Sequence, residues 1–184
     1  RAGSGNNVVD AREGIDFVYG LSGNDFLFGG NDEQLDQVYG GEDHDVLLGA
    51  LNSEDILFGD GGHDLLILSS GQMGGIGHGG GGDDVILGGA LANVITGDNG
   101  IDDGDDILVG GRGGDEIVGR GGRDLIMGGM QDQPGNVLGL DTGAIANPSP
   151  DNLYGDHESA HNAEILARVL KQDESGNWVV DQDQ

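Results

Sequence analysis

Residues Gly110–Met127 read GGRGGDEIV and then GRGGRDLIM, two nine-residue units that follow each other without a gap. Each unit has a glycine-rich first half, an aspartate at its sixth place and an aliphatic residue at its eighth place. A short period that repeats in this way is typical of solenoids, in which each repeat stacks on its neighbour. The unit therefore predicts a repeat architecture, and further copies of it occur along the chain.

The sixth place recurs through most of the sequence, as Asp in eleven of thirteen copies and as Asn in two. These residues are Asn7, Asp16, Asp25, Asp36, Asp45, Asp55, Asp64, Asp84, Asn93, Asp106, Asp115, Asp124 and Asp151. An aliphatic residue stands two places after each of them: Val9, Val18, Leu27, Val38, Leu47, Leu57, Leu66, Ile86, Ile95, Leu108, Ile117, Ile126 and Leu153. Because alternate residues of a strand face opposite sides, each copy predicts a short strand whose aliphatic residue points inward.

The spacing between sixth places predicts two different edges. The interval is nine from Asp16 to Asp25, Asp36 to Asp45, Asp55 to Asp64, Asp84 to Asn93 and Asp106 to Asp115, and it varies between these pairs. If two copies form one coil, all insertions fall on one edge, as is usual in solenoids. We therefore expect loops at Asn31–Leu35, Leu68–Gly82 and Asp98–Asp105 to project from the same edge.

From about Gly5 to Met127 the chain resembles the RTX (repeats-in-toxin) family of nonapeptide-repeat proteins. The resemblance implies an all-β fold, a right-handed parallel β-roll with two nonapeptides per coil and calcium held between successive turns. We expect the roll over residues 1–130, and a loop, one returning repeat and a short helix or hairpin over residues 131–184. The helix would lie at Glu164–Lys171, and in the hairpin this stretch would pair with Trp178–Val180.

The resemblance also implies which residues bind calcium, a hard ion that takes six to eight oxygen ligands in irregular geometry. Asn7 and Asn93 lack the carboxylate, and Leu91 replaces a turn glycine before Asn93, which weakens the prediction there. The alternative for any single aspartate is a turn cap through local hydrogen bonds. The expected ligands are Asp25, Asp45, Asp64 and Asp115 on the uniform edge, Asp16, Asp36, Asp55, Asp84, Asp106 and Asp124 on the looped edge, and the carbonyl groups of Gly23, Gly62, Gly82, Gly113 and Gly122.

Composition limits the partners of the chain. With 34 acidic against 7 basic residues, the net charge is −27, so nucleic acid and anionic membranes are not expected to bind. The chain has no Cys for disulfides or thiolate metal sites, and it has no apolar run long enough to span a membrane. Because Arg1 lies inside a degenerate copy, we expect the sequence to be a piece of a longer protein.

These observations favour a calcium-binding structural module of a larger secreted or cell-surface protein of bacterial type, which folds and becomes rigid when it binds calcium. An alternative is a self-assembling fibre or surface-layer component. Residues such as Phe17, Phe26, Phe28 and Phe58 occupy outward places on the expected strands, and apolar residues on both faces usually mean that both faces are covered. We therefore expect either self-association or packing on the parent chain.

One motif points to a different function. His157, Glu158 and His161 spell H-E-x-x-H, in which two histidines bind zinc and the glutamate acts as a base. Glu164 stands where the extended motif of secreted zinc proteases has glycine, and no third histidine follows. We therefore expect a polar segment here, no catalytic residues and no enzyme. The remaining histidines, His44, His63 and His78, are expected to be solvated in turns.

Overall fold

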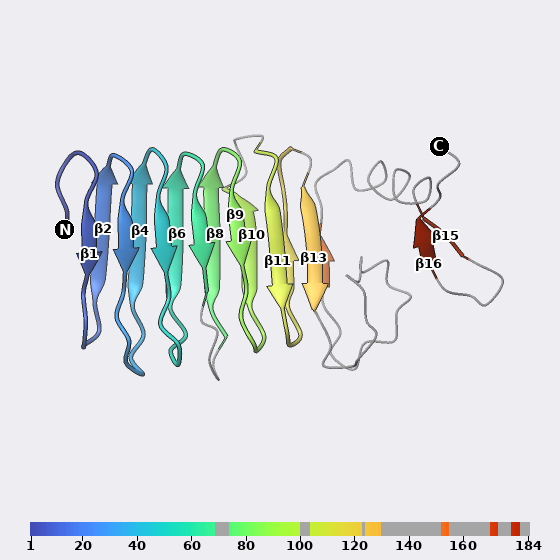
Figure 1. The fold of residues 1–184 in the computed structure, drawn as a ribbon, viewed down its shortest axis with the longest axis horizontal. Helices are drawn as coiled ribbons and strands as arrows, with labels where there is room; N and C mark the ends of the chain where they lie inside the picture. The colour runs from blue at the N-terminus through green and yellow to red at the C-terminus, as the bar shows by residue number, and fades with distance from the viewer. Residues whose placement is uncertain are drawn as a thin grey trace.

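The computed structural model describes residues 1–68, 74–99, 104–122, 124–129, 152–154, 170–172 and 178–180. Two parallel sheets of seven strands form the walls of a stack of coils (Figure 1). Sheet A contains β2 (Phe17–Ser22), β4 (Gln37–Glu42), β6 (Ile56–Gly61), β8 (Ile76–Gly81), β10 (Val94–Asp98), β12 (Glu116–Val118) and β14 (Asn152–Tyr154). Sheet B contains β1 (Val8–Asp10), β3 (Phe26–Phe28), β5 (Val46–Leu48), β7 (Leu65–Ile67), β9 (Val85–Leu87), β11 (Ile107–Gly111) and β13 (Leu125–Gly129).

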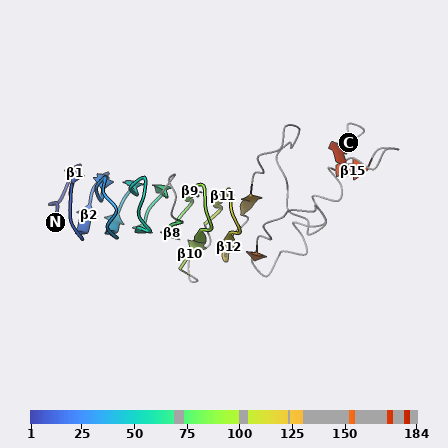
Figure 2. The same ribbon diagram turned by 90° about the horizontal axis from the view of Figure 1, so that it is seen from below.

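Each strand pairs with the strand one coil away, so equivalent places of the repeat lie side by side. On sheet A, Val38 pairs with Val18 on one side and with Leu57 on the other. On sheet B, Leu47 pairs in the same way with Leu27 and Leu66. Figure 2 shows the coils following one another along the long axis of the roll. The predicted parallel β-roll, with two strands in each coil, is confirmed.

The two edges of the roll are defined by the direction of the chain. Turns that lead from sheet A to sheet B, such as the turn between β2 and β3, lie on what we call the first edge, at the top of Figure 1. Turns that lead from sheet B to sheet A lie on the second edge, at the bottom of Figure 1. All first-edge turns therefore precede strands of sheet B.

The core is a single column of aliphatic side chains between the two sheets. Parallel strands need both faces covered, and here the inner face of each sheet is covered by the other sheet. Each residue of the buried aliphatic cluster occupies the eighth place of its repeat, except Leu68, which follows β7. The buried cluster consists of Val18, Leu27, Val38, Leu47, Leu57, Leu66, Leu68, Ile86, Ile95, Leu108 and Ile117.

Strand β8 was not predicted, because Leu68–Gly82 was expected to be a loop. Its repeat has Gly75 at the sixth place and Gly77 at the eighth place, so it lacks both residue types that identify the other copies. Gly77 still faces the core, where a Cβ would lie 3.0 Å from Leu68 Cδ2 and 3.0 Å from Ile86 Cγ2. Leu68, only 2% exposed, fills the space that the inward side chain occupies in other coils.

The unrecognised strand changes the assignment of edges beyond residue 68. Asp84, Asp106 and Asp124 precede β9, β11 and β13 of sheet B, so they lie on the first edge and not on the looped edge. Asp115 precedes β12 of sheet A and lies on the second edge. The segment Asp98–Asp105 connects β10 to β11 on the first edge, so the expectation that all insertions share one edge is wrong.

The C-terminal region adds two elements. Strand β14 pairs in parallel with β12, with Leu153 beside Ile117, as the returning repeat predicts. Strands β15 (Leu170–Gln172) and β16 (Trp178–Val180) form an antiparallel pair, which agrees with the hairpin and not with a helix that reaches Lys171. Residues 164–169 lie outside the described residues, and the domain boundary at residue 130 stays a prediction. Within the described part of the chain, no helix has the length and hydropathy to cross a membrane.

Aromatic rings form a stack on the outer face of sheet A. The rings of Tyr19 and Tyr39 are 4.9 Å apart, those of Tyr39 and Phe58 are 4.7 Å apart, and those of Phe58 and His78 are 5.0 Å apart. The Arg1 guanidinium lies over the Tyr19 ring at 5.1 Å, a cation–π contact. His78 is therefore part of a strand and of this stack, and the expectation that it is solvated in a turn is wrong.

The packing of Leu68 against Gly77 generates a prediction for a double-mutant cycle. Leu68→Ala should destabilise the folded chain by about 2–5 kcal/mol because it opens a cavity. Gly77→Val should cost about 1–3 kcal/mol because it overpacks the same space. The double variant should lose clearly less than the sum, since valine at residue 77 fills the cavity that alanine leaves. Urea unfolding in saturating calcium measures all three, and additive losses would contradict this account of the core.

Candidate metal sites

On the first edge, the sixth-place residues form a hydrogen-bonded ladder along the stack. The N–H of Asp25 donates to Oδ1 of Asp45 at 2.7 Å, and the N–H of Asp45 donates to Oδ1 of Asp64 at 2.7 Å. Each carboxylate therefore accepts from the backbone of the preceding coil and fixes two coils together. The same bond joins Asn7 to Asp25 (2.7 Å), Asp64 to Asp84 (2.8 Å), Asp84 to Asp106 (2.8 Å) and Asp106 to Asp124 (3.1 Å).

The other carboxylate oxygen of these residues faces a space that only glycine leaves open. Oδ2 of Asp25 is buried and accepts no hydrogen bond. A Cβ added to Gly20, the first-place residue of the same turn, would collide with this oxygen and with the carbonyl oxygen of Gly40 from the next coil. The same arrangement recurs at Gly40, Gly59, Gly79 and Gly97, beside Asp45, Asp64, Asp84 and Asp106.

These first-place glycines are functional candidates that the sequence reasoning did not name. The carbonyl groups expected to bind were those of fourth-place glycines: Gly23, Gly62, Gly82 and Gly122 on the first edge and Gly113 on the second. Those five residues all have positive φ, between 74° and 144°, so glycine has a conformational role there, and their part as ligands stays a prediction. Carbonyl oxygens of first-place glycines lie beside unpartnered carboxylate oxygens, and the fixed distance of five residues to the aspartate could have identified these glycines.

A second ladder runs along the second edge. The N–H of Asp16 donates to Oδ1 of Asp36 at 2.8 Å, and the N–H of Asp36 donates to Oδ1 of Asp55 at 2.9 Å. Oδ2 of Asp16 and Oδ2 of Asp36 are buried without a hydrogen-bond partner. Asp55 differs, because its Oδ2 accepts the N–H of Ala50 at 2.6 Å. Both oxygens of Asp55 are thus satisfied by backbone donors.

Asparagine at the sixth place supplies donors of its own. The Asn93 side-chain amide donates to the carbonyl oxygens of Leu91 at 2.6 Å and Gly110 at 3.0 Å, and to Oδ1 of Asp115 at 3.0 Å. The Asn7 amide likewise donates to the carbonyl oxygens of Gly3 and Gly5 and to Oδ1 of Asp25. An N–H group therefore lies among the turn oxygens where asparagine stands, whereas aspartate adds only acceptors. The asparagine turns therefore contain their own hydrogen-bond donor, whereas the aspartate turns with an unpartnered oxygen contain negative charge without such a donor.

Burial raises the pKa of several ladder carboxyl groups. The pKa rises to about 6 for Asp64, to about 8 for Asp84 and to about 7 for Asp106, and desolvation is the largest cause in each. The backbone N–H of the preceding coil lowers these values in part, and neighbouring carboxylates of the ladder raise them. On the second edge, desolvation raises the pKa of Asp36 to about 6. Placing these charges in the turns is therefore unfavourable unless a cation or proton neutralises them.

A third ladder, at the fifth place, contains two histidines. The N–H of His63 donates to Nδ1 of His44 at 2.8 Å, and the N–H of Asp83 donates to Nδ1 of His63 at 2.8 Å. The two imidazole rings stack with centroids 4.9 Å apart. A ring nitrogen that accepts a hydrogen bond carries no proton, so both rings link coils in their neutral form. His44 and His63 are exposed in turns, as expected, and in addition each accepts a backbone hydrogen bond from the next coil.

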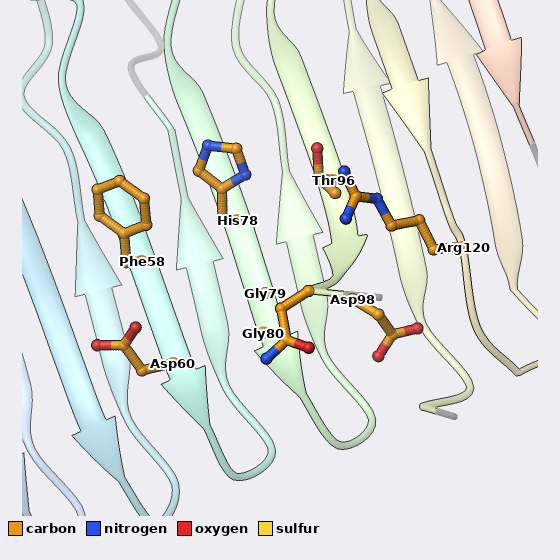
Figure 3. Close-up of a pocket in the computed structure, with 9 residues that line it drawn as sticks. Phe58, Asp60, His78, Gly79, Gly80, Thr96, Asp98 and Arg120 are labelled. Carbon is orange, nitrogen blue, oxygen red and sulfur yellow. The ribbon is translucent and has the colours of Figure 1, made fainter. Parts of the chain in front are cut away.

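A separate pocket of about 290 Å³ lies on the outer face of sheet A (Figure 3). Phe58, His78 and Thr96 line it from neighbouring strands, and the Arg120 guanidinium lies beside Thr96 in the view. Burial, and to a lesser degree the charge of Arg120, lowers the pKa of His78. None of the ligands predicted from the sequence lines this pocket, but Asp60, Gly79 and Asp98 do, so the pocket adjoins the first-edge turns.

The sequence reasoning also missed Asp98, which was assigned to a loop. Asp98 ends β10 and is 1% exposed. Carboxylate oxygens of Asp98, Asp106 and Asp124 lie within 4.8 Å of one another, and no second group of three such side chains comes this close among the described residues. An acidic residue at the second place, directly after a first-place glycine, is the signal that could have identified it. The His157–Glu158–His161 motif lies outside the described residues.

The donor set fits a hard cation. Carboxylate and carbonyl oxygens converge from adjacent coils, the sequence contains no cysteine thiolate, and the unpartnered oxygens lack any donor. Calcium accepts many oxygen ligands in irregular arrangements, whereas magnesium requires a near-ideal octahedron and keeps its water. The ladder aspartates Asp25, Asp45, Asp64, Asp84 and Asp106, with the carbonyl groups of the first-place glycines, would hold such an ion.

The comparison with family models agrees with this chemistry. The model of the RTX calcium-binding nonapeptide repeat matches residues 1–33, 35–53, 50–72, 78–103 and 101–132, which together cover more than half of the chain. Comparison with curated proteins and with solved structures finds no significant match. Stacked nonapeptides, buried carboxylate ladders and the family match lead to one conclusion: the chain belongs to the family of RTX calcium-binding nonapeptide-repeat proteins.

Proposed function

We propose that this chain is a calcium-dependent structural module of a larger secreted protein. The observation that carries the proposal is the contrast between Asp and Asn turns. Asn7 and Asn93 donate to the turn oxygens, whereas the aspartate turns present only oxygens, several of them buried without a partner. A bound cation would balance the negative charge at the aspartate turns whose second carboxylate oxygen has no partner. RTX repeats occur in secreted bacterial proteins, which supports a secreted location.

Calcium binding and folding are coupled in this proposal. The net charge is −27, and the ladders bring carboxylates of successive coils close together. Without cations, repulsion and desolvation oppose the stack, and the free energy of binding becomes free energy of folding. The role is structural rather than catalytic, because the bound ions stabilise the turns, and the turns fix the positions of the strands. Sites would lie on both edges, with Asp16, Asp36, Asp115 and Asp124 among the ligands.

The first test is calcium titration of two matched variants. Asp64 and Asp55 are both buried at the sixth place, but only Asp64 has a carboxylate oxygen without a partner. Wild type should change from coil to β-structure between chelator and millimolar calcium in circular dichroism. Asp64→Asn should lower the number of calcium ions bound in calorimetry, because one ligand charge is lost. Asp55→Asn should lower stability and leave that number unchanged.

A stably folded roll in chelator at low salt would contradict the coupling of calcium to folding. Equal loss of bound calcium in both variants would show that Asp55 is also a ligand and that the hydrogen bond from Ala50 is not its main role.

The raised pKa values predict proton release when calcium binds. Folded-state pKa values of about 6 to 8 lie above the ordinary value of 3.8, so protonation stabilises the calcium-free roll fully below pH 4. This contribution is lost as the pH rises through 6 to 8. Calcium therefore displaces protons in that window, and its affinity should fall on acidification from pH 8 to pH 6. Calorimetry in buffers of different ionisation enthalpy measures the protons released, and none released at pH 6.5 would contradict the prediction.

A second candidate function is assembly through sheet B. Its seventh-place residues point outward and are apolar in every coil, and those at both ends are well exposed: Val8 81%, Phe26 42%, Ile107 38% and Leu125 47%. The row is continuous: Val8, Phe26, Val46, Leu65, Val85, Ile107 and Leu125. Exposed apolar faces of this extent are typical of interaction surfaces. We propose that this face, named the sheet B face, packs on a second copy or on the parent chain.

The sheet B face can be tested against sheet A. Phe26→Thr, Leu65→Thr and Ile107→Thr together should leave calcium uptake intact and weaken self-association, because threonine keeps the strand but removes apolar area. Ile56→Thr, Ile76→Thr and Val94→Thr on sheet A serve as the matched control. Sedimentation in saturating calcium measures both. A wild-type chain that stays monomeric at high concentration would exclude self-association and leave packing on the parent chain.

A further inference from the structure

The second place of the repeat carries a carboxylate at two first-edge turns, and these two differ sharply. Asp60, in β6, is exposed, and it pairs with Gly41 and Gly80 of the neighbouring coils. Asp98 is 1% exposed and lies with Asp106 and Asp124, oxygen to oxygen within 4.8 Å. Other described first-edge turns have Leu21, Gly41, Gly80 or Arg120 at this place. The Asp98 turn is therefore the one, among those described, with a third buried carboxylate.

The insertion on the first edge explains why Asp98 is buried. Gly104 follows the inserted segment, and its N–H donates to Oδ1 of Asp98 at 3.4 Å. A Cβ on Gly104 would collide with the carbonyl oxygen of Gly82, so the returning chain lies directly against the preceding coil. The N–H of Asp98 donates to the carbonyl oxygen of Gly119 at 3.1 Å in the following coil. The end of the insertion therefore holds the Asp98 carboxylate, and the following coil holds its backbone.

A second observation, an unpartnered buried oxygen, points to a ligand at this cluster. Asp106 is 1% exposed, and its Oδ2 has no hydrogen-bond partner. That oxygen is aimed at Gly97, the residue before Asp98, where an added Cβ would collide with it. The same added Cβ would lie 2.7 Å from the carbonyl oxygen of Gly119. The buried Oδ2 of Asp106 and the carbonyl oxygen of Gly119 thus face one space, and no hydrogen-bond donor reaches this Oδ2.

We infer that Asp98, Asp106 and Asp124 form a three-carboxylate cation site, the tightest in the roll. The inference rests on the proposed calcium-binding function and adds a residue outside the sixth place to it. Affinity for hard cations rises with the number of ligand charges and with the rigidity of the site. Both are higher here, because Asp98 adds a charge and the Gly104 bond fixes its orientation. The same excess of negative charge selects trivalent lanthanide ions over calcium, since charge attraction grows with ion charge.

The test uses the full 184-residue chain and europium(III) as the probe. One equivalent of the ion fills the tightest site, and direct excitation reports its binding without a nearby aromatic ring. Asp98→Asn keeps an oxygen for the Gly104 hydrogen bond and removes the charge. It should weaken binding of the first equivalent by at least about tenfold. Asp60→Asn, the same change at the same place in an exposed turn, should leave it unchanged.

A second variant covers the case in which Asp98→Asn folds poorly. Asp98→Gly introduces glycine, the residue that two other first-edge turns have at the second place, as Gly41 and Gly80. For both Asp98 variants, the calcium concentration at half-maximal folding should rise, whereas the value for Asp60→Asn should match wild type. Circular dichroism at saturating calcium confirms that the chains compared are folded.

The outcomes separate the site from the general function. If Asp98→Asn and Asp60→Asn have equal effects while all chains still fold with calcium, the three-carboxylate site is overturned and the proposed function stands. If no chain gains β-structure with calcium, the proposed function fails and the site fails with it. A tenfold or larger loss confined to the Asp98 variants supports the site.

Discussion

The whole roll depends on one hydrogen bond, from the backbone N–H of each sixth-place residue to the carboxylate of the sixth-place residue one coil further on. The bond uses Oδ1 of Asp45, Asp64, Asp84 and Asp106 on the first edge, at 2.7–2.8 Å. It satisfies a backbone donor next to each strand and sets the register between coils. It also has a consequence for charge, because it places one carboxylate per coil along the edge, as far apart as the coils themselves. Structure and cation requirement thus have the same origin.

The two halves of each repeat stabilise the roll in different ways, one through the core and the other through the cation sites. The eighth-place side chains, such as Leu47 and Leu66, are fully buried and supply hydrophobic stabilisation in any solution. The turn carboxylates are equally buried but favour the roll only when their charge is neutralised. With about one buried aliphatic side chain per strand, the core is thin. Because the net charge is −27, the bound ions decide whether the free energy of folding is favourable. The fold can therefore respond to its environment.

Much of the structure could be predicted because each repeat carries an explicit marker. The aspartate and the aliphatic residue two places later identify every described strand of the roll except β8, and the parallel architecture follows from them. The exception has glycine at both places, Gly75 and Gly77, and its core space is filled by Leu68 from the previous strand. No local pattern reveals a side chain supplied by a neighbour. That single omission shifted the edge assignment of Asp84, Asp106, Asp115 and Asp124. Asp98 was missed for a related reason, because its burial depends on an inserted segment that returns at Gly104.

The exchange between Leu68 and Gly77 also limits how this array can change in evolution. Repeat arrays grow and shrink when a coil is duplicated or lost, which is harmless where neighbouring units are interchangeable. Here Gly77 leaves a space in the core that Leu68, the residue directly after β7, fills: its Cδ2 atom lies 3.0 Å from the position of an added Cβ. A recombination event that separates the two residues leaves a void on one side and a crowded core on the other. We therefore expect the coils that contain β7 and β8 to be retained together when the array gains or loses coils.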